Sequence, residues 1–86
     1  MRAQSEDKFG FTESERRQIL KELVIAEEKA MNEADTLYLS DIYKSAEKYR
    51  ELEEEYKAQV RAKYVITEEI QREIIVEALL KNWPLK

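Results

Sequence analysis

A chain of 86 residues has room for one small domain, because protein domains commonly run from about 50 to 200 residues. It contains no cysteine or histidine, one glycine and one proline, and 40% of its residues are charged. The missing residue types exclude imidazole and thiolate catalysis, Cys/His zinc sites and iron–sulfur or haem ligation, and one glycine is too few for the glycine-rich phosphate-binding motifs. We therefore expect a protein that is not an enzyme and that uses no cofactor or metal.

The formal net charge is −4, and acidic and basic residues are interleaved along the chain. A nucleic-acid-binding protein normally carries a basic face that neutralises phosphates, so nucleic acid is not the expected partner. The first residues are polar and carry both charge signs, unlike a secretory signal, and no run reaches the roughly 20 apolar residues of a membrane span. These features predict a cytoplasmic protein with neither a membrane partner nor an evident small-molecule substrate.

The N-terminal segment, residues 1–11, shows no helical periodicity and includes the single glycine, Gly10. It predicts a flexible, disordered arm in which Phe9 and Phe11 are candidate anchors to the rest of the protein. We expect the remaining residues, 12–86, to form a single helical domain without a linker or an internal repeat.

The first predicted helix spans about residues 12–33 and begins at a capping box. In this motif the Thr12 hydroxyl accepts a hydrogen bond from the amide of Glu15, while the Glu15 carboxylate accepts one from the amide of Thr12. The apolar positions that follow share one face of a helical wheel, and only Ile25 lies off that face. The predicted buried face consists of Ile19, Leu20, Leu23, Val24, Ala30, Met31 and Ala34.

A turn is expected within residues 32–40, where several side chains compete for backbone hydrogen bonds. These side chains are Asn32, Asp35, Thr36 and Ser40. Because no glycine or proline interrupts the stretch, one continuous helix of about fifty residues is the alternative. The second helix is predicted at about 38–64, antiparallel to the first, with an apolar stripe at three- and four-residue spacing. The stripe comprises Leu39, Ile42, Ala46, Tyr49, Leu52, Tyr56, Val60 and Tyr64.

The third helix is predicted at about residues 67–83, capped by Thr67 and followed by Pro84, which disfavours helical geometry in the residue before it. Its apolar residues cover more than half of its circumference. A polar strip lies opposite them and consists of Glu73, Glu77 and Lys81. A helix docked on a hairpin needs one apolar stripe, so the surplus predicts a second covered surface. The cover is either another protein chain or the first two helices, if the third is wedged between them.

Three tyrosines, Tyr49, Tyr56 and Tyr64, lie on the stripe of the second helix. Tyrosine buries its ring but needs a partner for its hydroxyl, which is typical both of thin bundle cores and of interfaces, and both interpretations stay open. Glu53 falls within this stripe. It either keeps its carboxylate in water at the edge of the stripe, or accepts a tyrosine hydrogen bond or pairs with a cation of a facing helix and so specifies register.

The prediction is an all-α protein, a small three-helix bundle built on a helical hairpin, whose core is small enough to favour self-association. We expect an acidic protein–protein interaction module, acting as an adaptor, assembly or regulatory protein, that forms a homodimer or a higher oligomer. The predicted interface combines the third helix with the tyrosine-bearing side of the second. Its residues are Ile75, Val76, Leu79, Leu80, Trp83, Tyr49, Tyr56 and Glu53.

Two other functions remain open. In the first, an acidic face centred on residues 51–55 makes the protein an inhibitor of a basic or nucleic-acid-binding site, and its binding weakens steeply with salt. In the second, a DNA-binding regulator uses the third helix or the N-terminal arm. Basic groups within residues 16–21 and 57–63 are candidate phosphate contacts, although acids interleave the first group and the second suits a helix C-terminus.

Overall fold

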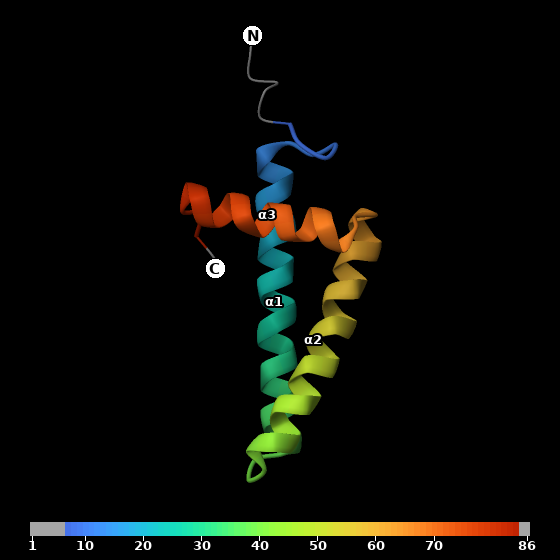
Figure 1. The fold of residues 1–86 in the computed structure, drawn as a ribbon, viewed down its shortest axis with the longest axis vertical. Coiled ribbons are helices and arrows are strands. Elements are labelled where there is room, and N and C mark those ends of the chain that lie inside the picture. The colour runs from blue at the N-terminus through green and yellow to red at the C-terminus, as the bar shows by residue number, and fades with distance from the viewer. Residues whose placement is uncertain (1–6, 85–86) are drawn as a thin grey trace.

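The computed structural model describes residues 7–84, which form three helices in succession: α1 (Glu13–Leu37), α2 (Ile42–Tyr64) and α3 (Glu68–Lys81). α1 and α2 pack as an antiparallel hairpin, and α3 folds back and crosses the N-terminal half of α1 (Figure 1). The predicted all-α hairpin is therefore confirmed, and the alternative of one continuous helix is wrong. No helix within residues 7–84 is long and apolar enough to cross a membrane.

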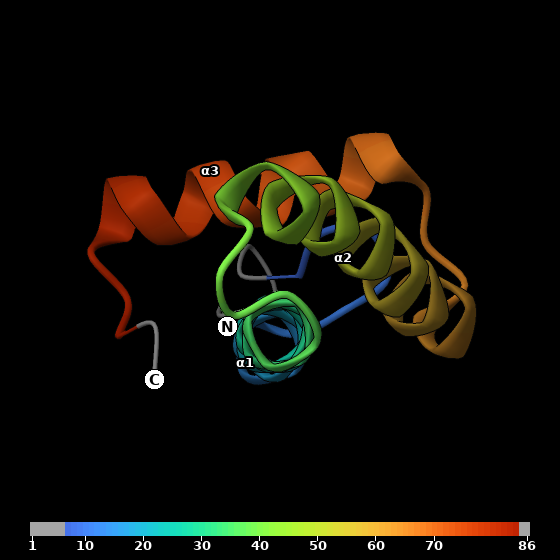
Figure 2. The same cartoon turned by 90° about the horizontal axis from the view of Figure 1, so that it is seen from below.

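The hairpin is closed at one end and open at the other. α1 and α2 come together at their connecting turn and diverge towards the end where α3 lies (Figure 1). Viewed along the hairpin, α2 and α3 both lie on the same side of α1 (Figure 2). The molecule is elongated, with principal extents of 56 × 24 × 15 Å. One long face of the molecule therefore carries α3 at one end and the hairpin turn at the other.

Each helix begins at a side-chain cap. Thr12 accepts a hydrogen bond from the Glu15 amide at 3.2 Å and the Glu15 carboxylate accepts one from the Thr12 amide at 2.8 Å, which confirms the capping box. Asp41 accepts from the third amide of α2, and Thr67 accepts in the same way at the start of α3. These caps satisfy amides that have no partner within their own helix.

The first helix ends at Leu37, later than predicted. Thr36 does not break the helix, because its hydroxyl donates a hydrogen bond to the Asn32 carbonyl, 2.8 Å away and one turn back along the same helix. Asp35 also remains helical, and its carboxylate accepts a hydrogen bond from Ser45 of α2 at 3.1 Å. The expected turn therefore falls at the end of the predicted stretch.

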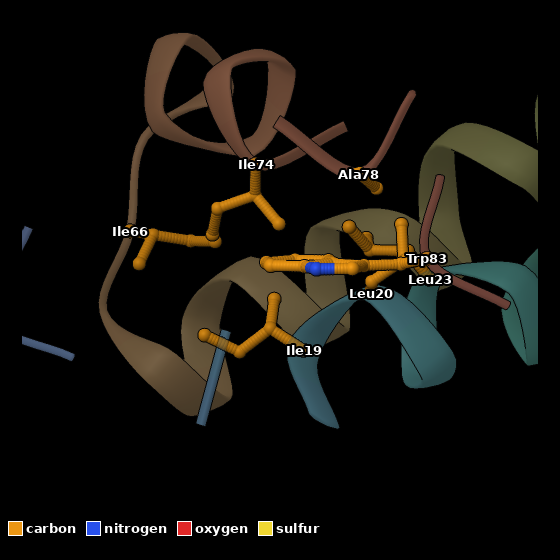
Figure 3. Packing of buried hydrophobic residues seen from close by; sticks show 7 residues of the cluster. All are labelled: Ile19, Leu20, Leu23, Ile66, Ile74, Ala78 and Trp83. Carbon is orange, nitrogen blue, oxygen red and sulfur yellow. The ribbon is translucent and has the colours of Figure 1, made fainter. Parts of the chain in front are cut away.

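The apolar core lies at the open end of the hairpin, where α1, α3 and the turn before α3 meet. Its buried members are Ile19, Leu20, Leu23, Ile66, Ile74, Ala78 and Trp83. Asn82 ends α3 in a left-handed conformation, and the Trp83 amide donates to the Ala78 carbonyl at 2.9 Å. This reversal brings the indole ring between Leu20 of α1 and Ala78 of α3 (Figure 3). Trp83, which the sequence placed in an interface with another chain, is thus part of the core of its own chain.

The seam between the two long helices is thinner than the predicted stripes imply. α1 contributes the small buried residues Ala26, Ala30 and Ala34, and α2 buries only Leu52. The prediction that Met31 is buried is wrong, since 52% of its surface is exposed. Along most of its length, each helix of a diverging hairpin packs against one neighbouring helix. Less of its circumference is therefore buried than in a three-helix bundle, where each helix packs against two.

Residues 8–11 form a tight turn in front of α1. Lys8 and Phe11 exchange two backbone hydrogen bonds of 2.9 Å, and the residues between them, Phe9 and Gly10, have positive φ. Phe11 packs against the core and meets Tyr64 edge-on, with 6.2 Å between ring centroids. Phe11 therefore anchors this end of the predicted arm, whereas residues 1–6 lie outside the described part of the chain.

Candidate interaction surface

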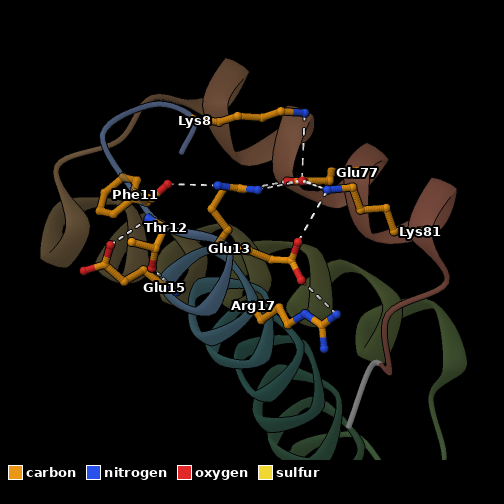
Figure 4. Close-up of polar contacts among 9 residues, drawn as sticks. Lys8, Phe11, Thr12, Glu13, Glu15, Arg17, Glu77 and Lys81 are labelled. Carbon is orange, nitrogen blue, oxygen red and sulfur yellow. Dashed lines mark hydrogen bonds and ion pairs between the residues drawn. The ribbon is translucent and has the colours of Figure 1, made fainter. Parts of the chain in front are cut away.

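A buried ion pair between Arg16 and Glu77 holds α3 on α1. Nε and Nη2 of Arg16 donate to the two carboxylate oxygens of Glu77 at 2.7 and 2.8 Å, and only 0% and 6% of the two side chains are exposed. Nη1 of the same guanidinium donates to the Phe11 carbonyl at 2.8 Å. One arginine therefore ties together the N-terminal turn, α1 and α3 (Figure 4).

Further charges surround this pair. Lys81 donates to Glu77 at 2.8 Å and lies 3.6 Å from the Glu13 carboxylate, which also pairs with Arg17 at 3.0 Å (Figure 4). The hydrogen bonds from Arg16 are the main cause that lowers the pKa of Glu77 to about 2, and Lys81 adds to the effect. The carboxylate thus stays ionised despite its burial.

This geometry corrects two sequence predictions. Glu77 does not belong to an outward polar strip of the third helix, because it faces α1 and pairs there with Arg16. Arg16 is correspondingly not a surface candidate for phosphate contact. Because Glu77 points inward, the rotation of α3 about its axis turns the opposite side of the helix away from the core.

The exposed side of α3 carries three apolar residues in its C-terminal half, after the exposed Arg72 and Glu73. Val76, Leu79 and Leu80 are 42%, 68% and 82% exposed. Beside them, Leu79 and the half-buried Ile75 form one wall of a groove of about 110 Å³. The rest of the groove is lined by Leu20, Leu23, Val24, Glu27 and Lys57. We call Val76, Leu79, Leu80 and the adjoining groove the α3 face.

The tyrosines and Glu53 occupy a different place, the polar seam between α1 and α2. The Tyr49 hydroxyl donates to Glu53 at 3.2 Å, and Lys57 donates to Glu53 at 3.0 Å and to Glu27 of α1 at 2.8 Å. Glu53 therefore makes the tyrosine hydrogen bond that was one of its two predicted roles. Its cation lies on its own helix and bridges to α1.

Tyr56 spans the same seam. Its hydroxyl donates to the Glu33 carboxylate of α1, and this hydrogen bond is the main cause that raises the pKa of Tyr56 to about 12. Tyr64 donates in the same way to Glu22. The hydroxyls of the seam tyrosines thus have partners in their own chain, whereas the apolar residues of the α3 face remain exposed.

The turn of the hairpin carries a second apolar surface, which the sequence analysis missed. We call it the hairpin tip. Its exposed fractions are 60% for Leu37, 36% for Tyr38, 85% for Leu39, 77% for Ile42 and 84% for Tyr43. Leu39 and Ile42 match the three- and four-residue spacing of a buried stripe, but they lie where α1 has already ended. Leu39 lies within the turn predicted at residues 32–40 and Ile42 follows that turn closely, and this position was the signal that could have identified them as exposed.

The acidic run of α2 is largely neutralised by its own chain. Glu51 pairs with Lys48 at 3.0 Å and Glu54 pairs with Arg61 at 2.6 Å. Within the described residues, no group of three or more acidic side chains could hold a metal ion. The α3 face and the hairpin tip, in contrast, each expose at least three large apolar side chains.

No protein-family model matches this chain, and neither a curated protein nor a solved structure shows significant similarity to it.

Proposed function

We propose that this protein is a small protein–protein interaction module that self-associates through the α3 face. The observation that carries the proposal is the exposure of Val76, Leu79 and Leu80 on a helix whose other side is already docked on the core. Fully burying one Val or Leu side chain stabilises a protein by about 1.5–3 kcal/mol. Covering three partly exposed ones therefore favours association by several kcal/mol, before the loss of translational and rotational freedom is subtracted.

The position of α3 supports the proposal as well. The bidentate pair of Arg16 with Glu77 and the packing of Trp83 fix the rotation of the helix, so the apolar side is held outward. A contiguous exposed apolar patch held in a fixed geometry is typical of an interaction site. The two-sided apolar character that the sequence predicts for this helix thus has a physical counterpart in one docked and one exposed side.

An acidic inhibitor has weaker support. Its face would centre on residues 51–55, where Lys48 and Arg61 already pair with Glu51 and Glu54. Internal pairing reduces the field that such a face presents to a basic partner.

A DNA-binding regulator also has weaker support. Arg16 is buried against Glu77, and Lys57 and Lys63 pair with carboxylates of α1 at 2.8 and 3.0 Å. These cations are engaged within the chain, so they form no free basic patch.

The solution mass tests the proposal. We expect light scattering to report a dimer or larger assembly whose mass is insensitive to salt, because apolar burial is not screened. Leu80→Glu places a charge in the α3 face, so the variant should be monomeric with unchanged helical content by circular dichroism.

Ile25→Glu is the matched control. Ile25 is 51% exposed and lines a different hollow, between α1 and α2, to which α3 contributes no residue. We expect this variant to keep the wild-type mass. A wild-type chain that is monomeric at all concentrations, or equal dissociation of the two variants, would contradict self-association through the α3 face.

A further inference from the structure

We propose that the hairpin tip of one copy binds the α3 face of a second copy, so that two chains form an antiparallel dimer with two-fold symmetry. This inference rests on the self-association proposed above and assigns the surface that covers the α3 face. It is carried by the presence of two exposed apolar surfaces at opposite ends of the molecule.

The placement of the two surfaces fits a two-fold axis. α3 crosses one end of the hairpin and the tip forms the other end, along the 56 Å dimension (Figure 1). α3 and the start of α2 lie on the same side of α1 (Figure 2). A two-fold rotation about an axis perpendicular to the long dimension brings each tip opposite the α3 of the other copy. Both surfaces of both chains are then covered at once, as in an isologous interface.

The exposed areas favour this pairing over self-pairing of either surface. If a fully exposed large side chain presents about 200 Å², the exposed fractions give about 380 Å² for the α3 residues and about 680 Å² for the tip. Stable interfaces bury about 800 Å² on each partner. A contact that uses both surfaces covers about 1,060 Å² of apolar side chain per chain, which is more than an α3-to-α3 or a tip-to-tip contact covers.

The shape of the two surfaces agrees with the same arrangement, and the net charge does not prevent it. The tip is a projection, with Leu39 as its most exposed large side chain, and the α3 face includes an apolar groove. Each chain carries a net charge of −4, so two copies repel weakly at long range. Salt screens that repulsion without weakening apolar contact, so the dimer is expected to persist at high salt.

Cysteine cross-linking tests the arrangement, because the natural chain has no cysteine. Ser40→Cys places a thiol at the tip and Glu73→Cys places one on α3, one and two turns before Val76 and Leu80, and both changes leave the apolar residues in place. The two variants, one of them lengthened by a tag so that products differ in mass, are mixed and treated with a short bismaleimide linker. We expect mixed tip-to-α3 dimers as the main product. Glu73→Cys mixed with Ile25→Cys is the matched control and should not cross-link above background.

The outcomes separate this inference from the proposed function. If cross-links form mainly between two Ser40→Cys chains or two Glu73→Cys chains, the antiparallel arrangement is wrong although self-association stands. A stable dimer by light scattering without mixed cross-links overturns the arrangement in the same way. A wild-type chain that is monomeric by light scattering overturns both. As a second readout, Leu39→Glu should dissociate the dimer as fully as Leu80→Glu, and a dimer that survives Leu39→Glu contradicts a role for the tip.

Discussion

Arg16 and Glu77 are separated by 61 positions in the sequence and share a bidentate contact in the fold. Removing one partner of a buried ion pair leaves the other without compensation, which commonly costs about 3–5 kcal/mol. Glu77→Gln should therefore lower the free energy of unfolding by about 3 kcal/mol. Urea denaturation followed by circular dichroism and by the fluorescence of Trp83, which lies between α1 and α3, measures the loss.

A double variant guards against the case in which Glu77→Gln does not fold. Replacing a buried ion pair by apolar side chains of similar volume is often neutral or stabilising. Arg16→Met combined with Glu77→Leu should thus recover most of the stability that Glu77→Gln loses. A single variant as stable as the wild type would show that the pair does not hold α3 on α1.

Acid should weaken the wild-type protein through the same pair. The pKa of the Glu77 carboxyl is lowered from its ordinary value of 4.5 to about 2, chiefly by Arg16. The unfolded chain consequently binds this proton at higher pH than the folded chain does. The stabilisation is complete above pH 4.5 and is lost as the pH falls from there towards 2.

Unfolding curves measured at a series of acidic pH values test this dependence. The double variant Arg16→Met with Glu77→Leu lacks the titrating group, so its stability should fall less steeply than that of the wild type. The carboxyl of Glu22 also has a lowered pKa, and its contribution is common to both proteins. Parallel pH profiles for the two proteins would contradict the assignment of the effect to Glu77.

At the scale of the helices, what depends on neighbours along the chain could be predicted from sequence. The capping box at Thr12 needs only the spacing of two residues, and the cap at Thr67 needs one hydroxyl before a helical run. The hairpin follows from two amphipathic runs joined by a short polar stretch. The excess of apolar residues around the third helix could also be predicted, since it depends only on the positions of these residues on a helical wheel.

The orientation of α3 could not be predicted in this way. A helical wheel shows that Glu77 lies opposite an apolar arc, but it cannot show that Arg16 lies buried beside it and draws that side inward. Burial of the tip residues depends in turn on where the neighbouring helix stops. Leu39 and Ile42 fit the period of a buried stripe and are exposed because α1 ends at Leu37. Both errors concern contacts between elements, on which local periodicity carries no information.

At the scale of the whole molecule, the core and the exposed apolar surfaces have a common origin. The chain concentrates its buried side chains at the crossing of α1 and α3, and the seam along the rest of the hairpin buries three alanines, Leu52 and a set of polar contacts. A core of this size gives a domain of fewer than 100 residues little stability to spare. Covering the α3 face and the hairpin tip by a second copy would therefore add apolar burial at both ends of the molecule.

Stability should accordingly depend on protein concentration. If only the folded chain dimerises, mass action makes unfolding harder as the concentration rises. A tenfold increase adds about 1.4 kcal/mol per dimer, or about 0.7 kcal/mol per chain, which for a chain of this length raises the Tm by roughly 3–5 °C. Thermal unfolding followed by circular dichroism over two decades of concentration measures the slope for the wild type and for Leu80→Glu. The wild-type Tm should rise with concentration and that of Leu80→Glu should stay constant, because a monomer unfolds independently of its concentration. If neither Tm depends on concentration, folding is not coupled to association, and the exposed apolar ends have no role in stability.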